Sequence, residues 1–137
     1  LGLGGETDMA GVPARSFAPE LAGETFDWDD VGFLEQEESR AIRTPDWLFV
    51  KRFKDSRAYP LEDELYDLKN DADERRNLAG DEGCAVIESE LDARLGAFFD
   101  KYADPRFDLW RGGSAKSNAS RPWLWKDAWG AGWETVT

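Results

Sequence analysis

Few residues in this chain have the types and spacing that catalysis requires. The 137-residue sequence holds one cysteine, Cys84, and no histidine. Ser-His and Cys-His nucleophilic pairs and histidine-based zinc sites therefore cannot be built from it alone. Cys84 stands in the run Gly-Cys-Ala-Val-Ile, which we interpret as a small buried residue at a helix start. A single cysteine also excludes an intrachain disulfide.

Two acidic clusters have side chains that could hold calcium. They are Asp27-Trp28-Asp29-Asp30 and the run from Asp71 to Glu74. Neither follows the D-x-[DN]-x-[DN]-G spacing of a dedicated calcium loop. We interpret both as solvated acidic surface and expect no metal site in the chain.

The C-terminal part holds the only residues that we single out as ligand contacts. Arg111 and Lys116 flank the glycine pair 112–113 and could close over an anion or substrate, with the glycine amides forming a nest. The alternative interpretation is a solvated linker. Trp123 and Trp125 could stack on sugar rings, or could bury themselves against another domain.

The net charge of -12, from 29 acidic and 17 basic side chains, limits the partners. Such a field repels nucleic acid and anionic lipid headgroups, so we expect neither as a partner. An anionic ligand would also be repelled at long range and would need a local basic cluster. No apolar run approaches the about 20 residues that span a bilayer, and residues 1–10 do not resemble a signal peptide. The compartment is left open.

Hydrophobic periodicity predicts a small sheet followed by a helix. Residues 31–37 alternate as a first strand, 41–53 as a longer strand bent near Pro45, and 64–68 as a short third strand. Asp71 followed by Glu74 predicts an acidic cap and a brief helical turn ending near residues 79–80.

The clearest helix spans residues 82–103. Its apolar residues recur at the 3.6-residue period of one helix face, and Pro105 ends it. They are Ile87, Leu91, Leu95, Phe98, Phe99 and Tyr102. The fold class is therefore α+β: a small antiparallel sheet of three to four strands covered by one long amphipathic helix, with an irregular lead-in and a Trp-rich tail.

Four sequence elements stand in an order that resembles a known family. Residues 40–44 read R-A-I-R-T, 64–68 read E-L-Y-D-L and 71–78 read D-A-D-E-R-R-N-L, and the helix follows. This order is similar to the C-terminal subdomain of type I sulfatases of the alkaline-phosphatase-like superfamily. Residues 8–21 resemble the family's lead-in. Ala72 stands where Pro is usual, and Leu48-Phe49 where Lys-Tyr is frequent.

The resemblance implies a four-stranded antiparallel sheet with a packed helix, and a catalytic domain elsewhere. Sulfatases are expected to use a formylglycine made from Cys or Ser in C-x-P-S-R or S-x-P-S-R, with a calcium ion at the sulfate. Cys84 has neither Pro nor Arg where that motif needs them. We therefore expect no catalytic residue or cofactor in this chain. Calcium and formylglycine are expected only in the missing catalytic domain.

These expectations define three segments and a main hypothesis. Residues 1–24 are predicted to be a lead-in from the end of the missing catalytic domain, 25–104 the sulfatase subdomain, and 105–137 a Gly/Trp-rich tail. The chain would be the C-terminal fragment of an arylsulfatase-like sulfuric ester hydrolase, supporting the substrate cleft without catalysing. Its partners would be the missing N-terminal domain and, in the parent, a sulfated small molecule or glycan. The alternative is a stand-alone acidic, Trp-rich module that binds carbohydrate or protein.

Overall fold

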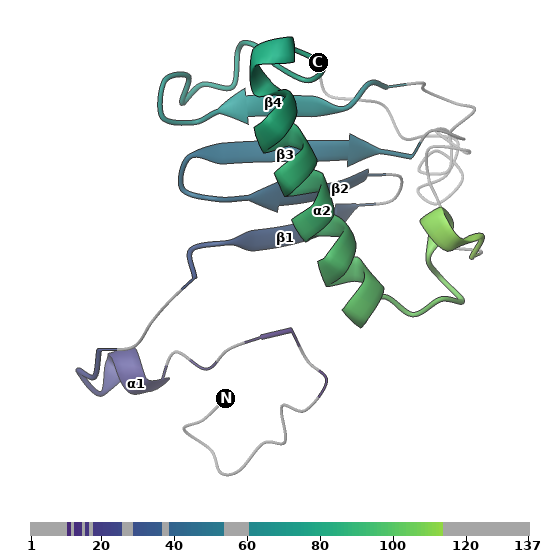
Figure 1. Cartoon of the computed structure of the whole chain (residues 1–137). Coiled ribbons are helices and arrows are strands. Elements are labelled where there is room, and N and C mark those ends of the chain that lie inside the picture. Colours follow the sequence, from purple (N-terminus) through teal and green to yellow (C-terminus); the bar gives the residue numbers. More distant parts are fainter. Residues whose placement is uncertain are drawn as a thin grey trace, which may run out of the picture.

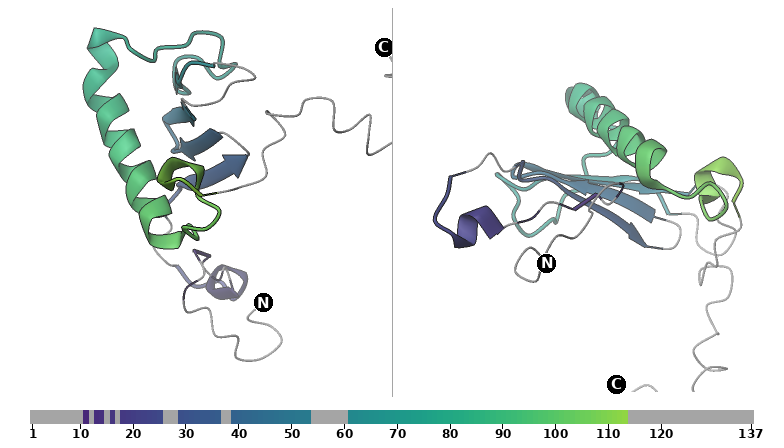
Figure 2. Two further views of the ribbon diagram at one scale, coloured as in Figure 1. Left: turned by 90° about the vertical axis from the view of Figure 1, so that its right-hand side faces the viewer. Right: turned by 90° about the horizontal axis from the view of Figure 1, so that it is seen from below.

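The computed structural model describes residues 11, 13, 14, 16, 18–25, 29–36, 39–53 and 61–113. A short helix, α1 (Ala18–Leu21), precedes four strands: β1 (Gly32–Gln36), β2 (Ser39–Arg43), β3 (Trp47–Arg52) and β4 (Glu64–Asp67). A 3₁₀ turn, η1 (Glu82–Cys84), leads into α2 (Ala85–Tyr102), and a second, η2 (Leu109–Arg111), follows. The predicted α+β class is confirmed, because α2 lies across one face of a four-stranded antiparallel sheet (Figures 1 and 2).

The strands follow one another across the sheet in the order β1-β2-β3-β4. One apolar row crosses all four strands, because Phe33 pairs with Ile42, Ile42 with Phe49, and Phe49 with Leu65. Side chains alternate between the two faces of a sheet, so this row lies on the face that α2 covers. The row is the floor of the hydrophobic core.

The predicted single long strand over 41–53 is wrong. The chain reverses at residues 44–46 and forms the β2–β3 hairpin. The Thr44 N–H donates to the Trp47 carbonyl at 2.8 Å, and the Trp47 N–H donates to the Thr44 Oγ1 atom at 2.9 Å. Pro45 cannot donate a backbone hydrogen bond and fits a turn, where none is needed. Pro45 therefore lies in a chain reversal between two strands and not in a bend within one strand.

The amphipathic helix packs its predicted stripe on the apolar row. Leu91, Leu95 and Phe99 are buried, with exposures of 1%, 1% and 7%, and Ile87 and Phe98 pack beside them. Phe98 stacks on Phe33 with ring centroids 3.9 Å apart. Burying each such side chain stabilises the fold by about 1.5–3 kcal/mol. The helix prediction is confirmed, with its first turn in the 3₁₀ form η1.

The predicted helical turn after Asp71 is wrong. Residues 71–81 form turns, and Glu74 has a left-handed φ of 55° that stops a right-handed helix. The Asp71 carboxylate caps this loop instead, because its Oδ2 atom accepts from the N–H groups of Arg75 and Arg76, each at 2.8 Å. Leu78 turns inward after this loop and packs on the core.

The sheet face opposite α2 carries a second set of apolar side chains. Alternation places Leu34, Leu48, Val50 and Tyr66 on this face. The Leu34 side chain is 54% exposed. The two faces of the sheet therefore differ: α2 seals one, and the other presents apolar side chains to its surroundings.

The segments that flank the sheet and helix are described only in part. Residues 18–21 form the short helix α1, where Ser16 Oγ accepts from the Ala18 N–H. Residues 1–10 of the predicted lead-in lie outside the described residues, and the segment boundaries 24/25 and 104/105 stay predictions. Within the described ranges, no helix is long and apolar enough to cross a membrane.

Candidate functional site

The structure places only one of the predicted ligand-contact residues. Arg111 ends η2, just after α2. Lys116, Trp123 and Trp125 lie outside the described residues, so the predicted anion contact and sugar stacking stay predictions.

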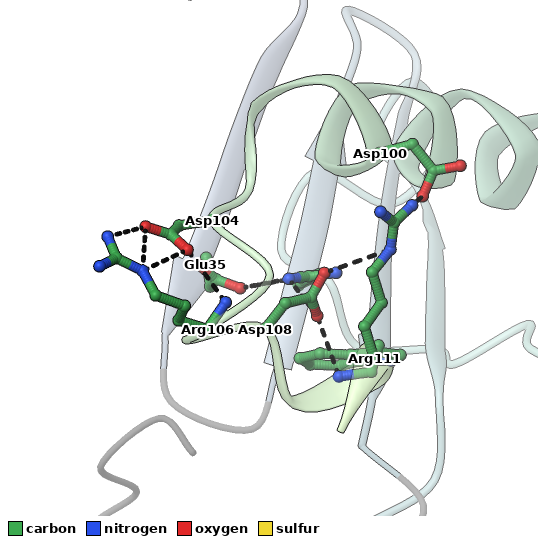
Figure 3. Close-up of polar contacts among 8 residues, drawn as sticks. Glu35, Asp100, Asp104, Arg106, Asp108 and Arg111 are labelled. Carbon is green, nitrogen blue, oxygen red and sulfur yellow. Dashed lines mark hydrogen bonds and ion pairs between the residues drawn. The ribbon is translucent and has the colours of Figure 1, made fainter. Parts of the chain in front are cut away.

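Arg111 lies between two carboxylates. Its guanidinium forms an ion pair with Asp100 of α2, and its Nε atom lies 3.6 Å from Asp108 Oδ2 (Figure 3). The side chain is 42% exposed. An incoming anion would therefore have to compete with two internal acceptors.

The amides of the glycine pair also have internal partners. The Gly112 N–H donates to the Leu109 carbonyl at 3.2 Å, and the Gly113 N–H donates to the Asp108 carbonyl at 2.7 Å. A nest binds an anion through free N–H groups. These two amides close a turn instead, and Gly112 takes a left-handed φ of 78°, which favours glycine.

Sequence reasoning missed the most buried cation near this site, Arg40 of β2. Its guanidinium lies between the rings of Phe99 and Trp110, 4.0 and 4.3 Å from their centroids. It donates to Glu35 Oε1 at 2.8 Å and to Asp108 Oδ1 at 2.9 Å. We call these five residues the Arg40 junction. The signal was present: Arg40 is two residues before the inward-facing Ile42, so it lies on the same face of the strand.

Asp108 belongs to a segment that we call the strap, residues 104–113. The side chain is 1% exposed. Its Oδ1 atom also accepts from the Trp110 N–H at 3.0 Å and so caps η2 (Figure 3). The Oδ2 atom has no hydrogen-bond partner in the described structure, and the Arg111 Nε atom at 3.6 Å is too distant to be one. The Asp108 carboxylate is thus held by its attraction to Arg40 and Arg111 and by the hydrogen bonds that its Oδ1 atom accepts.

A small cavity of about 190 Å³ opens between α2, β3 and the strap. Lys51 forms an ion pair with Asp92 on one wall, and Arg111 forms one with Asp100 on another. Trp110 adds an aromatic wall. Among the described residues that line the cavity, each cation is paired with a carboxylate, so none is free to bind a sulfate. The lining also has no Ser, Thr, Cys or Tyr.

The exposed end of the strap carries a separate ion pair. Arg106 donates to both carboxylate oxygens of Asp104, as Figure 3 shows. These side-chain hydrogen bonds, aided by the Arg106 backbone N–H, lower the pKa of Asp104 from 3.8 to about 2. Both side chains reach solvent, so this pair is a local surface feature.

The described residues offer no group of metal ligands for the calcium ion of sulfate ester hydrolysis, and the sequence has no formylglycine motif. Cys84 is the half-buried cap residue of α2 and lacks the Pro and Arg of the formylglycine motif. Among the described residues, no three acidic or cysteine side chains come together as metal ligands. Of the first acidic cluster, Asp29 lies 3.9 Å from Arg94, while residues 27 and 28 lie outside the described ranges. No step of hydrolysis can therefore be derived for these side chains.

Comparison with solved structures identifies the architecture. A 2-O GAG sulfatase is 26% identical, with a TM-score of 0.56 over 75% of this chain. The phosphonate monoester hydrolase of Silicibacter pomeroyi is 22% identical, with a TM-score of 0.57 over 69% of this chain, and so shows the fold alone. The chain spans 22% of the length of each. It has the fold of the C-terminal subdomain of a sulfatase.

A third structure agrees on the fold. A protein in complex with its substrate D-glucosamine-2-N,6-O-disulfate is 24% identical, with a TM-score of 0.55 over 74% of this chain and 22% of that one. No family model matches the chain, and no curated protein does. The sulfatase resemblance of the four sequence elements is thus confirmed through structure.

Proposed function

We propose that the chain acts as the non-catalytic C-terminal part of a sulfuric ester hydrolase, where it stabilises the catalytic domain and completes the rim of the substrate cleft. The observation that carries this proposal is a sulfatase subdomain fold that spans 22% of a sulfatase and contains no C-x-P-S-R or S-x-P-S-R sequence. The reactive residues would lie in the other part of the enzyme.

The sheet face opposite α2 supports a role in domain packing. Leu34, Leu48, Val50 and Tyr66 offer apolar area there, and Leu34 alone is more than half exposed. Contiguous apolar patches on a soluble domain mark surfaces that another protein part covers. A catalytic domain seated on this face would bury these side chains at about 25 cal/mol per Å² of apolar area.

The charge of the chain limits how it could act on substrate. At -12 it repels a sulfated small molecule or glycan. The cations of the Arg40 junction and of the neighbouring cavity are neutralised by carboxylates. The sulfate would therefore be held by the catalytic domain, together with its calcium and formylglycine, while this subdomain would shape the space around the rest of the substrate.

The coding sequence upstream of Leu1 tests the proposal. We expect several hundred in-frame codons that contain C-x-P-S-R or S-x-P-S-R. An in-frame stop directly before Leu1 would contradict it. Dye binding by the 137-residue chain adds a physical readout, because an uncovered apolar face should enhance the fluorescence of an apolar probe. The Leu34→Ser variant should reduce that signal, whereas the exposed Val86→Ser variant on α2 should not.

A further inference from the structure

We infer that Arg40 and Asp108 form a charge lock that holds the strap against the end of β3 and fixes Gly113 there. The lock joins residues 68 positions apart in the sequence. It is independent of the proposed function, because it requires only the subdomain itself. The lock therefore fixes the position of residue 113 relative to the sheet.

The surroundings of Arg40 fix the directions from which a carboxylate can reach it. With a side chain 7% exposed, it has lost nearly all of its hydration. Its planar guanidinium is stacked by aromatic rings on both faces, so its hydrogen bonds can form only in its own plane. Glu35 takes one direction in that plane, and Asp108 takes another. Of these two carboxylates, Asp108 is the buried one, at 1% against 45% for Glu35.

Asp108 transmits this anchoring to the rest of the strap. Its Oδ1 atom accepts from Arg40 and from the Trp110 N–H, so one atom both docks the strap and starts η2. Trp110 then covers Arg40 and meets Phe53, at the end of β3, in an edge-to-face contact of 5.3 Å. Trp110, a residue of the strap, is thus one of the two rings that enclose the Arg40 guanidinium. That guanidinium in turn binds the strap through Asp108.

Gly113 closes the strap and cannot be replaced without strain. A Cβ atom at this position would lie 2.5 Å from the Asp108 amide nitrogen, 2.7 Å from its carbonyl oxygen and 2.9 Å from the Pro105 carbonyl oxygen. These are backbone atoms of the strap itself, which cannot rotate away as a side chain could. The turn therefore requires glycine, and this requirement is an independent sign of close packing.

Hydrogen exchange measured by mass spectrometry tests the lock in the 137-residue chain. Asp108→Ala removes the anchor, and Arg40→Lys keeps the charge but loses the planar fork. We expect both variants to raise amide exchange in the strap at least tenfold, while the α2 amides of residues 91–99 keep their protection. Arg106→Ala is the matched control, because it removes a charged strap side chain that is 78% exposed and leaves the backbone hydrogen bonds of the strap in place. It should change exchange less than twofold.

Two outcomes would overturn the lock. One is unchanged strap exchange in Asp108→Ala. The other is equal acceleration across the sheet, α2 and the strap in Arg40→Lys, which would make Arg40 a general core residue. If Arg40→Lys does not fold, Asp108→Asn decides, because it removes the charge of the side chain and keeps its size. Strap release with protected α2 amides supports the lock, and a protected strap contradicts it.

Discussion

The helix-covered core and the Arg40 junction lie side by side and are stabilised differently. The core joins α2 to the sheet through Phe49, Leu65 and Leu95, which need only matching volume and burial. The junction joins the strap to the sheet through Arg40 and Asp108, where direction and charge both matter.

Their responses to damage should therefore differ. A truncated core side chain loses contacts and leaves a cavity, and the cost depends on volume. A junction that loses one partner leaves the other charge buried, and removing both charges can restore what removing one has lost. Truncations in the core should therefore cost more than the loss of a junction charge, and changes at a helix cap or an exposed ion pair should cost least.

Phe49→Ala should have the largest effect, because Phe49 is 2% exposed at the centre of the apolar row. We expect the free energy of unfolding to fall by about 3–5 kcal/mol, measured by urea denaturation followed by far-UV circular dichroism. Phe107→Ala is the matched control. Its side chain is 60% exposed, so the change should stay within about 0.5 kcal/mol. Equal losses in the two variants would refute the placement of the core.

The effects of substitutions at Arg40 and Asp108 on the free energy of unfolding should not be additive. Asp108→Leu should lower the free energy of unfolding by about 2–3 kcal/mol, less than the about 3–5 kcal/mol typical of a broken buried pair, because the strap can detach and rehydrate Arg40. Adding Arg40→Met removes the stranded charge and should recover at least about 1 kcal/mol. The same denaturation assay measures both. A double variant whose loss equals the sum of the two single losses would contradict an energetic coupling between Arg40 and Asp108.

The start of α2 should respond to its cap. Asp81 Oδ1 accepts from the Gly83 N–H at 2.8 Å, so Asp81→Ala should cost about 1 kcal/mol of unfolding free energy. Glu82→Ala, one residue later, removes a carboxylate that does not cap the turn and should cost less. If thermal denaturation ranks the two variants in the opposite order, the assignment of the cap is wrong.

The exposed Asp104–Arg106 pair should have the smallest effect. Because Arg106 lowers the pKa of Asp104 to about 2, a carboxyl NMR titration should find that midpoint, and Arg106→Ala should return it toward 3.8. A lowered folded-state pKa stabilises the fold above the usual pKa, and this contribution is lost as the pH falls through about 2. The change in stability should be small, because solvent screens the pair. An unchanged midpoint in Arg106→Ala would contradict the contact.

The sequence predicted the core better than the junction, for a physical reason. Leu91, Leu95 and Phe99 repeat at the helical period, so one-dimensional spacing reveals their common face. Arg40 and Asp108 are 68 residues apart, and no local period connects them.

The predictions for the two turn regions were wrong for a different reason. The strand-forming residues on both sides of Pro45 fit either one bent strand or a hairpin of two strands. The structure has the hairpin, because β3 pairs antiparallel with β2. Residues 71–74 likewise match a helix-capping pattern, but Glu74 has a left-handed φ, which a right-handed helix does not allow. Lys116 and the tryptophans at 123 and 125 lie outside the described residues, so their predicted contacts await experiment.

The central claim is that this domain belongs to a sulfate-ester hydrolase without performing its chemistry. Turnover of 4-nitrophenyl sulfate tests this most directly, measured for the 137-residue chain and for the protein of its complete reading frame, each with calcium present. We predict hydrolysis by the complete protein and none above the buffer control by the 137 residues. Hydrolysis by the 137-residue chain alone, or a complete protein that has no sulfatase activity, would contradict the claim.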